Sequence, residues 1–363
     1  MMPMHTSPTH SPHAHAPATV SRGMATVILA LVPATLFGFW LYGLPAVLTW
    51  AVALLAALAG EAFAVKLMGR AVGPALMDGS AILTAWLLAL SLPPWAPWWI
   101  AALGSFFAVV VVKQIFGGLG QNVFNPAMAA RVMLLISFPV EMTAWVGVHP
   151  VTSPGTPGLM DALAVTFGGM QLDGMASASV LGHIKTEASR GIGLEQALGS
   201  FFSTGGGLVD MAKGLRAGSL GETGAALLAL GGLVLIAKRI ITWHAPVAML
   251  LGVALPALLA STLAPASYAG PMLHLLSGGV VLGAFFIITD PVTSPNTAAG
   301  QFVFGLGCGL LTWIIRTWGG YPEGVAFAVM IMNAAVPVID RYVKPRIYGR
   351  DRRGQALSVE QAK

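Results

Sequence analysis

Three basic side chains, Lys113, Arg131 and Arg316, lie within long apolar stretches of this sequence. Ionisable groups inside a membrane are costly, and they usually line an ion path or pair with an opposite charge. Arg131 lies about two helical turns inside its stretch, and we expect Asp290 to be its partner. Together with Asn125, these side chains are the candidates to line an ion path.

Breaks in the apolar stretches would place charged helix ends beside these groups. Asn125 followed by Pro126 is typical of a helix start, because Asn caps free amides and Pro suits the first turn. Asp290-Pro291 predicts a break that ends a span. Each terminus exposes backbone groups with a partial charge, which could bind an ion or could only shape the packing.

Two acids, Glu61 and Asp78, lie within about a turn of the end of an apolar stretch. A carboxylate at that depth can reach the interface or cap a helix. We therefore expect these two residues to snorkel or to cap rather than to line the path.

A second candidate is a loop of small residues with two hydroxyl groups, from Asp173 to Leu181. It contains Ser177, Ala178 and Ser179 in succession. Taken alone, this pattern predicts no more than a turn.

The composition indicates the environment in which the chain folds and positions these residues. Of 363 residues, 56% are hydrophobic and only 9% are charged, whereas soluble domains carry about 25% charged residues. The chain therefore belongs in a membrane, in contact with lipid. Its net charge of +5 does not indicate nucleic acid, because the basic residues lie at membrane edges. The single cysteine, Cys308, excludes an internal disulfide and a four-cysteine iron–sulfur cluster.

A helix needs about 20 apolar residues to cross a bilayer. The sequence predicts about ten such spans, and the short ones next to prolines suggest broken helices around a cavity. The expected spans are 24–43, 45–65, 79–92, 97–116, 124–138, 223–241, 243–263, 272–289, 301–317 and 323–341.

Two segments about 200 residues apart resemble each other: Phe116–Phe124 matches Trp318–Ala326. An odd number of spans in each half would invert the second half relative to the first. We therefore expect an all-α bundle of two inverted five-helix repeats. The expected parts are a disordered cytoplasmic tail (1–22), the first repeat (23–138), a long outer segment (139–221), the second repeat (222–342) and a basic cytoplasmic tail (343–363).

The positive-inside rule orients the chain, because basic loops remain in the cytoplasm. It places both termini in the cytoplasm of a bacterial inner membrane and segment 139–221 in the periplasm. The basic residues of that segment are few: Lys185, Arg190, Lys213 and Arg216.

The chain resembles the RnfD and NqrB family over nearly all of residues 24–345. The matching segments are Asp78–Ser80, Leu87–Ala89, Lys113, Gly117–Ala127, Gly221-Glu222, Phe285-Phe286, Thr289–Val292, Ile315-Arg316, Gly319–Val329, Asn333 and Pro337–Asp340. The resemblance implies a fold like that of urea transporters, in agreement with the inverted repeat.

The resemblance also implies FMN, joined through a phosphoester to a hydroxyl residue of the loop. Asp173 opens the family's motif, Ala178 matches its alanine, and Ser179 occupies the acceptor position. This sequence departs from the motif at Ala176 and Val180, and Ser177 remains a rival acceptor. A non-covalent riboflavin is a further implied cofactor, for which the sequence indicates no site.

The implied function is to relay electrons between NADH and ferredoxin or flavodoxin while Na⁺ or H⁺ crosses the membrane. The implied partners are the other Rnf subunits (A, B, C, E and G), membrane lipid and a flavin transferase. Two alternatives remain open on the sequence: a quinone-reducing subunit of the NqrB type, and a flavin-free channel of the urea-transporter class.

Overall fold

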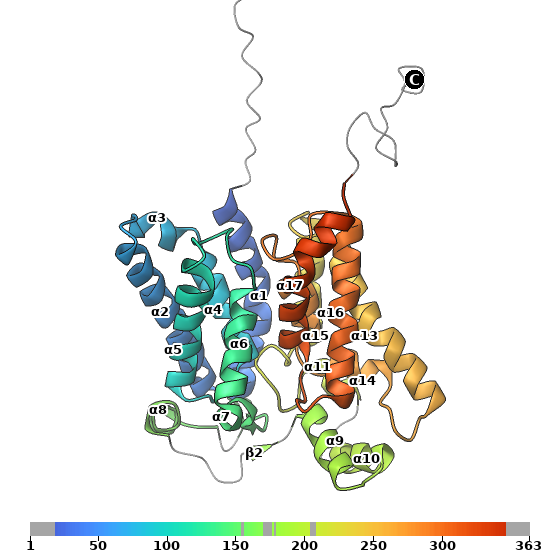
Figure 1. The fold of residues 1–363 in the computed structure, drawn as a ribbon. Coiled ribbons are helices and arrows are strands. Elements are labelled where there is room, and N and C mark those ends of the chain that lie inside the picture. The colour runs from blue at the N-terminus through green and yellow to red at the C-terminus, as the bar shows by residue number, and fades with distance from the viewer. Residues whose placement is uncertain (1–18, 154–155, 170–175, 178, 204–207, 346–363) are drawn as a thin grey trace, which may run out of the picture.

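The computed structural model describes residues 19–153, 156–169, 176–177, 179–203 and 208–345. Within these residues the chain is predominantly helical, and its apolar helices run between two ends of a bundle (Figure 1). The start of α1 and the end of α17 lie at the same end of this bundle. The prediction of an all-α membrane protein is confirmed.

The N-terminal half begins with two long helices that meet at Gly43. This glycine has a φ of 70°, a left-handed value that suits glycine and lets the chain reverse before Pro45. The later helices of this half are shorter, and the fourth ends beside Pro93-Pro94. The helices are α1 (Val20–Tyr42), α2 (Leu44–Leu67), α3 (Val72–Met77), α4 (Ser80–Ser91), α5 (Trp98–Phe106), the π-helix η1 (Phe107–Gln114) that continues α5, and α6 (Pro126–Ser137).

The C-terminal half also mixes long helices with interrupted ones. The segment from 271 to 287 is broken into two short helices and a π-helical turn, which ends just before Asp290. The elements are α12 (Ala225–Ala237), α13 (His244–Leu263), α14 (Pro271–Leu276), α15 (Val280–Leu282), η2 (Gly283–Ile287), α16 (Ala298–Trp318) and α17 (Val325–Tyr342).

Within the described part of the chain, five helices are long and apolar enough to cross a membrane: α1, α2, α13, α16 and α17. The shorter apolar helices include α4, α5 with η1, α6 and α12. The expected spans 79–92 and 124–138 are thus the short helices α4, which ends just before Pro93, and α6, which begins at Pro126 and ends just before Pro139. The chain is a multi-pass membrane protein.

The segment between the halves gathers at the end of the bundle opposite the start of α1 (Figure 1). It contains two-residue strands that pair antiparallel, Trp145 with Ser177 and Val146 with Ala176. Its elements are α7 (Pro139–Thr143), β1 (Trp145–Val146), α8 (Leu159–Gly168), β2 (Ala176–Ser177), α9 (Val180–Ser189), α10 (Leu194–Ser203) and α11 (Leu208–Lys213).

Close packing of α13 on α16 depends on glycine. A Cβ atom added at Gly309 would lie 2.3 Å from the carbonyl oxygen of Met249, and one added at Gly305 would lie 2.4 Å from that of Ala245. Small residues let membrane helices approach closely enough for dispersion contacts to hold them together. This pair of helices therefore forms a rigid part of the second half.

Candidate functional site

A cavity of about 280 Å³ opens at the end of the bundle where α1 begins. Three residues predicted to line an ion path, Lys113, Asn125 and Asp290, lie on its wall. The wall comes from α1, α4, η1, α6, α12 and η2. The expectation that broken helices surround a cavity is confirmed.

Asn125 caps α6 as its sequence pattern predicted. Its side-chain oxygen accepts from the amide of Met128 at 3.2 Å, and Pro126 occupies the first turn. The amide of Asn125 donates to Asn333 Oδ1 of α17 at 3.0 Å, and Asn333 Nδ2 donates to the carbonyl of Thr293 at 2.8 Å. Asn333 thus joins the start of α6 to the break after η2.

Asp290 closes that break rather than binding Arg131. Its carboxylate accepts from the amide of Val292 and from Thr293 Oγ1, each at 3.1 Å. Arg131 instead donates to the carbonyl of Ser91. The predicted Arg131–Asp290 pair is therefore wrong, because the side chain of Arg131 approaches the last turn of α4 and not the cavity.

Lys113 is held by a buried ion pair beside the cavity. Its ammonium lies 2.7 Å from Glu61 Oε1 and also donates to Ser80 Oγ at 2.7 Å. The side chains of Lys113 and Glu61 are 2% and 1% exposed, so Glu61 does not snorkel as expected. Asp78 does cap: it accepts from the amide of Ser80 at 2.7 Å.

A second ionic cluster lies below the cavity, toward the opposite end of the bundle. Arg316 donates to Glu323 Oε2 at 2.9 Å and to the carbonyls of His274 and Ser277. Glu323 also accepts from the amides of Gly279, Gly324 and Val325. Arg131 and Glu323 line one small hollow together.

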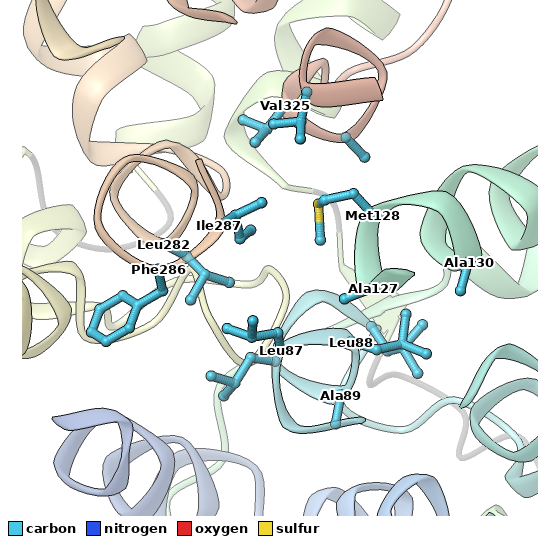
Figure 2. Close-up of a cluster of buried hydrophobic side chains, with 14 of the residues drawn as sticks. Leu87, Leu88, Ala89, Ala127, Met128, Ala130, Leu282, Phe286, Ile287 and Val325 are labelled. Carbon is cyan, nitrogen blue, oxygen red and sulfur yellow. The ribbon is translucent and has the colours of Figure 1, made fainter. Parts of the chain in front are cut away.

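An apolar layer separates the cavity from this cluster. Figure 2 shows Leu87, Met128 and Ile287 converging from α4, α6 and η2, with Val325 of α17 beside them. Leu87 also lines the cavity, whereas Met128, Ile287 and Val325 line the hollow that contains Arg131. Apolar side chains from both sides of this layer therefore lie between the two polar regions.

Ser179 is the N-cap residue of α9. Its Oγ accepts from the amide of Gly182 at 3.2 Å, and the residue is 7% exposed. It lines a hollow of about 20 Å³ with Arg216 and Glu222. The predicted motif residues Asp173 and Ala178 lie outside the described residues, and so does the side chain of the rival Ser177.

Lys185 lies in the same helix as the Ser179 cap, about two turns farther along. Its ammonium donates to the carbonyls of Ile315, Gly319 and Tyr321, at 3.3 Å for Ile315 and 2.7 Å for Tyr321. Partial burial lowers the pKa of the Lys185 amine.

A family model described as NQR2, RnfD, RnfE matches residues 7–349. The chain belongs to the NQR2, RnfD, RnfE family.

Relatives within this NQR2, RnfD, RnfE family cover nearly the whole chain. The D subunit of the ion-translocating oxidoreductase complex of Stutzerimonas stutzeri is 50% identical over 94% of this chain and 95% of its own length. The D subunits of the same complex from Halorhodospira halophila and Escherichia fergusonii are 47% and 42% identical, over 96% and 93% of this chain and 97% of their own length.

The sequence patterns gave Glu61 only a snorkelling or capping role, and they did not single out Glu323, which pairs with Arg316, or Glu222, which lines the hollow beside Ser179. The available signal was their position at the ends of apolar stretches, and for Glu222 and Glu323 a neighbouring glycine or proline. Glu323 follows Pro322, and its carboxylate binds the first amides of α17. Glu61 binds Lys113 and Glu323 binds the amide of Gly279, each from a distant segment, so these partners are visible only in the fold.

Proposed function

We propose that this chain is the D subunit of an ion-translocating NADH:ferredoxin or flavodoxin oxidoreductase complex. The observation that carries the proposal is the match of nearly the full chain to D subunits of ion-translocating oxidoreductase complexes. Its partners would be the A, B, C, E and G subunits, and its role would be to relay electrons while Na⁺ or H⁺ crosses the membrane.

We infer that ten segments cross the membrane as two inverted five-helix repeats. Equivalently placed cations support this. Lys113 ends the fourth crossing of the first half, and Arg316 ends the fourth crossing of the second half. The carboxylate partner of Lys113 lies at the cavity end and that of Arg316 toward the opposite end. An inverted repeat predicts this antiparallel placement.

We propose that Ser179 carries FMN through a phosphoester. The first amides of α9 and the positive end of its dipole favour a phosphoryl group at the N-cap position. Arg216, which lines the same hollow, supplies a positive side chain on that wall. The hollow is too small for the flavin ring, so the residues fit the phosphoryl end of FMN alone. FMN bound there would accept and pass on electrons at the periplasmic surface.

The test of this attachment is flavin fluorescence on a denaturing gel, since only covalent flavin survives there. Ser179→Ala should abolish the fluorescent band, and Ser177→Ala should retain it. Loss of the band with Ser177→Ala alone would assign the flavin to the other hydroxyl. A band absent from the unmodified protein, purified from cells that contain the flavin transferase, would contradict the proposed cofactor.

We propose the upper cavity as the site of a non-covalent riboflavin. Its volume of about 280 Å³ is near the lower end of small-molecule sites, which span about 300–1,000 Å³. Leu83, Leu87, Phe285 and Phe286 offer apolar walls for a ring system. The cavity's polar groups, which suit ribityl hydroxyls, are Ser80, Thr84, Lys113, Asn122, Asn125, Thr289 and Asp290.

The ion path is proposed to run through the apolar layer, from the cavity to the lower cluster. Lys113, Asn125 and Asp290 would face its upper part, and Arg131 and Arg316 its lower part. An apolar layer of this kind can block a hydrated ion by excluding water. A small shift of α6 against η2 would therefore open or close the path.

The cavity end is proposed to face the cytoplasm of a bacterial inner membrane, with segment 139–221 in the periplasm. The distribution of basic residues supports this, because Lys66 lies in the last turn of α2 and Arg70, Lys238 and Arg239 lie in loops at the cavity end.

A further inference from the structure

The helix that begins at Ser179 is attached to the rest of the protein along one apolar face. Val180 and Leu181 are buried against Met211 of α11 and Leu273 of α14. This small cluster is separate from the main core. Six partly buried apolar residues also pack against these four: Ile184, Leu198, Phe201, Phe202, Ala269 and Leu276. A polar contact outside this cluster would fix the position of the ten-residue helix further.

Lys185 supplies that contact through the C-terminal end of α16. The last carbonyls of a helix have no partners within the helix, and they form the negative end of its dipole. The Lys185 ammonium donates to one carbonyl in the last turn, Ile315, and to two in the following loop, Gly319 and Tyr321. Charge-assisted bonds of this kind are about twice as strong as neutral ones.

A basic side chain binds the matching carbonyl in the other half of the protein. Gly117, in the segment that resembles the one containing Gly319, accepts from Arg70 Nη1 at 2.8 Å. Arg70 reaches this carbonyl from the segment that follows α2, whereas Lys185 reaches its own from α9. Both halves thus use a cation from a separate segment to bind the loop after the fourth crossing.

The loop bound by Lys185 leads directly to the lower ionic cluster. Ile315 precedes Arg316, and Tyr321 lies two residues before Glu323, which binds the Arg316 guanidinium at 2.9 Å. Movement of this loop relative to α9 would therefore change the distance from Ser179 to the Arg316–Glu323 pair.

We propose that Lys185 is a positioning residue that fastens α9 to the connection between α16 and α17. It holds Ser179, the residue at the start of α9, at a fixed place relative to the Arg316–Glu323 pair. An effect of Lys185 on the midpoint potential of the flavin rests on the proposed function, in which Ser179 carries FMN. The attachment of α9 through Lys185 does not rest on it.

The test uses the assembled complex in lipid nanodiscs and compares Lys185→Met with Arg190→Met. Arg190 is a matched control, because it lies at the end of the same helix and forms a local ion pair with Glu187 at 2.9 Å, while 66% of its side chain is exposed. Hydrogen exchange of the α9 amides measures the attachment, and the midpoint potential of the covalent flavin measures the consequence.

Lys185→Met should raise the exchange rate of the α9 amides by about tenfold or more and shift the flavin midpoint potential. Arg190→Met should change neither quantity. Lys185→Arg should give an exchange rate between those of the unmodified protein and Lys185→Met. The planar guanidinium of arginine keeps the charge but fits three converging carbonyls less well. If Lys185→Met prevents assembly, Lys185→Arg is compared with Arg190→Lys instead. Faster exchange of the α9 amides in Lys185→Arg than in Arg190→Lys would then support the proposal, and equal exchange would overturn it.

Equal α9 exchange in Lys185→Met and Arg190→Met would overturn the proposal. An unchanged midpoint potential with faster exchange would also overturn it, since α9 would then move without effect on the flavin. Absence of covalent flavin from the unmodified protein would instead contradict the flavin at Ser179, and the exchange result would stand independently.

Discussion

Removal of the Lys113 ammonium should be among the most destabilising single changes in the first half. In Lys113→Met, Glu61 would remain in a site where its side chain is 1% exposed, and it would lose its cationic partner, at 2.7 Å. Breaking a buried ion pair in this way costs about 3–5 kcal/mol, because one buried charge is left uncompensated. Another donor to Glu61, Gln114 Nε2 at 2.7 Å, offsets part of that cost but carries no charge.

The assay is the free energy of unfolding in a denaturing-detergent titration, followed by helical circular dichroism. Arg190→Met provides the comparison, since that exposed pair should contribute about 0–1 kcal/mol. The double variant Glu61→Gln/Lys113→Met should recover most of the loss, because neither charge then remains. A loss for Lys113→Met no larger than that for Arg190→Met would refute the reasoning, as would a double variant less stable than the single one.

Three further predictions concern packing, coupling and topology. Gly309→Ala should cost about 1–3 kcal/mol of unfolding free energy, because its Cβ would lie 2.3 Å from a carbonyl of α13, whereas Gly23→Ala, with open space around it, should cost little. Asp290→Asn should retain flavin and assembly but lower gradient-driven ferredoxin reduction by NADH. NADH oxidation by an artificial acceptor should be unchanged. Ferredoxin reduction at the wild-type level would instead make Asp290 a structural helix terminus. A cysteine at the exposed Gln196, in a Cys308→Ala background, should react with an impermeant thiol reagent from the periplasm, and reaction from the cytoplasm alone would reverse the topology.

Local sequence patterns were sufficient for the helix ends. Asn125 followed by Pro126 predicted a capped start, and the structure places a cap with a 3.2 Å hydrogen bond there. Asp290-Pro291 predicted a break, and η2 ends at Ile287. These helix ends depend on a few consecutive residues, so the local sequence is enough to predict them.

The partners of the buried charges were not predictable in the same way. Glu61 and Lys113 are separated by 52 positions in the chain, and Lys185 and Tyr321 by 136. Charge alone made Asp290 a reasonable partner for Arg131, but the packing of α6 against α4 directs the guanidinium to the carbonyl of Ser91. Such pairings follow from helix packing, which no local pattern encodes.

The proposed electron transfer depends on a covalent flavin at the α9 cap residue, Ser179. Its most direct test is tandem mass spectrometry of the protease-derived peptide that contains Ser177 and Ser179, from protein purified with its partner subunits. FMN on Ser179 should give a peptide heavier by FMN less one water, with fragment ions that place the added mass on Ser179. An unmodified peptide, or fragments that place the mass on Ser177, would contradict it.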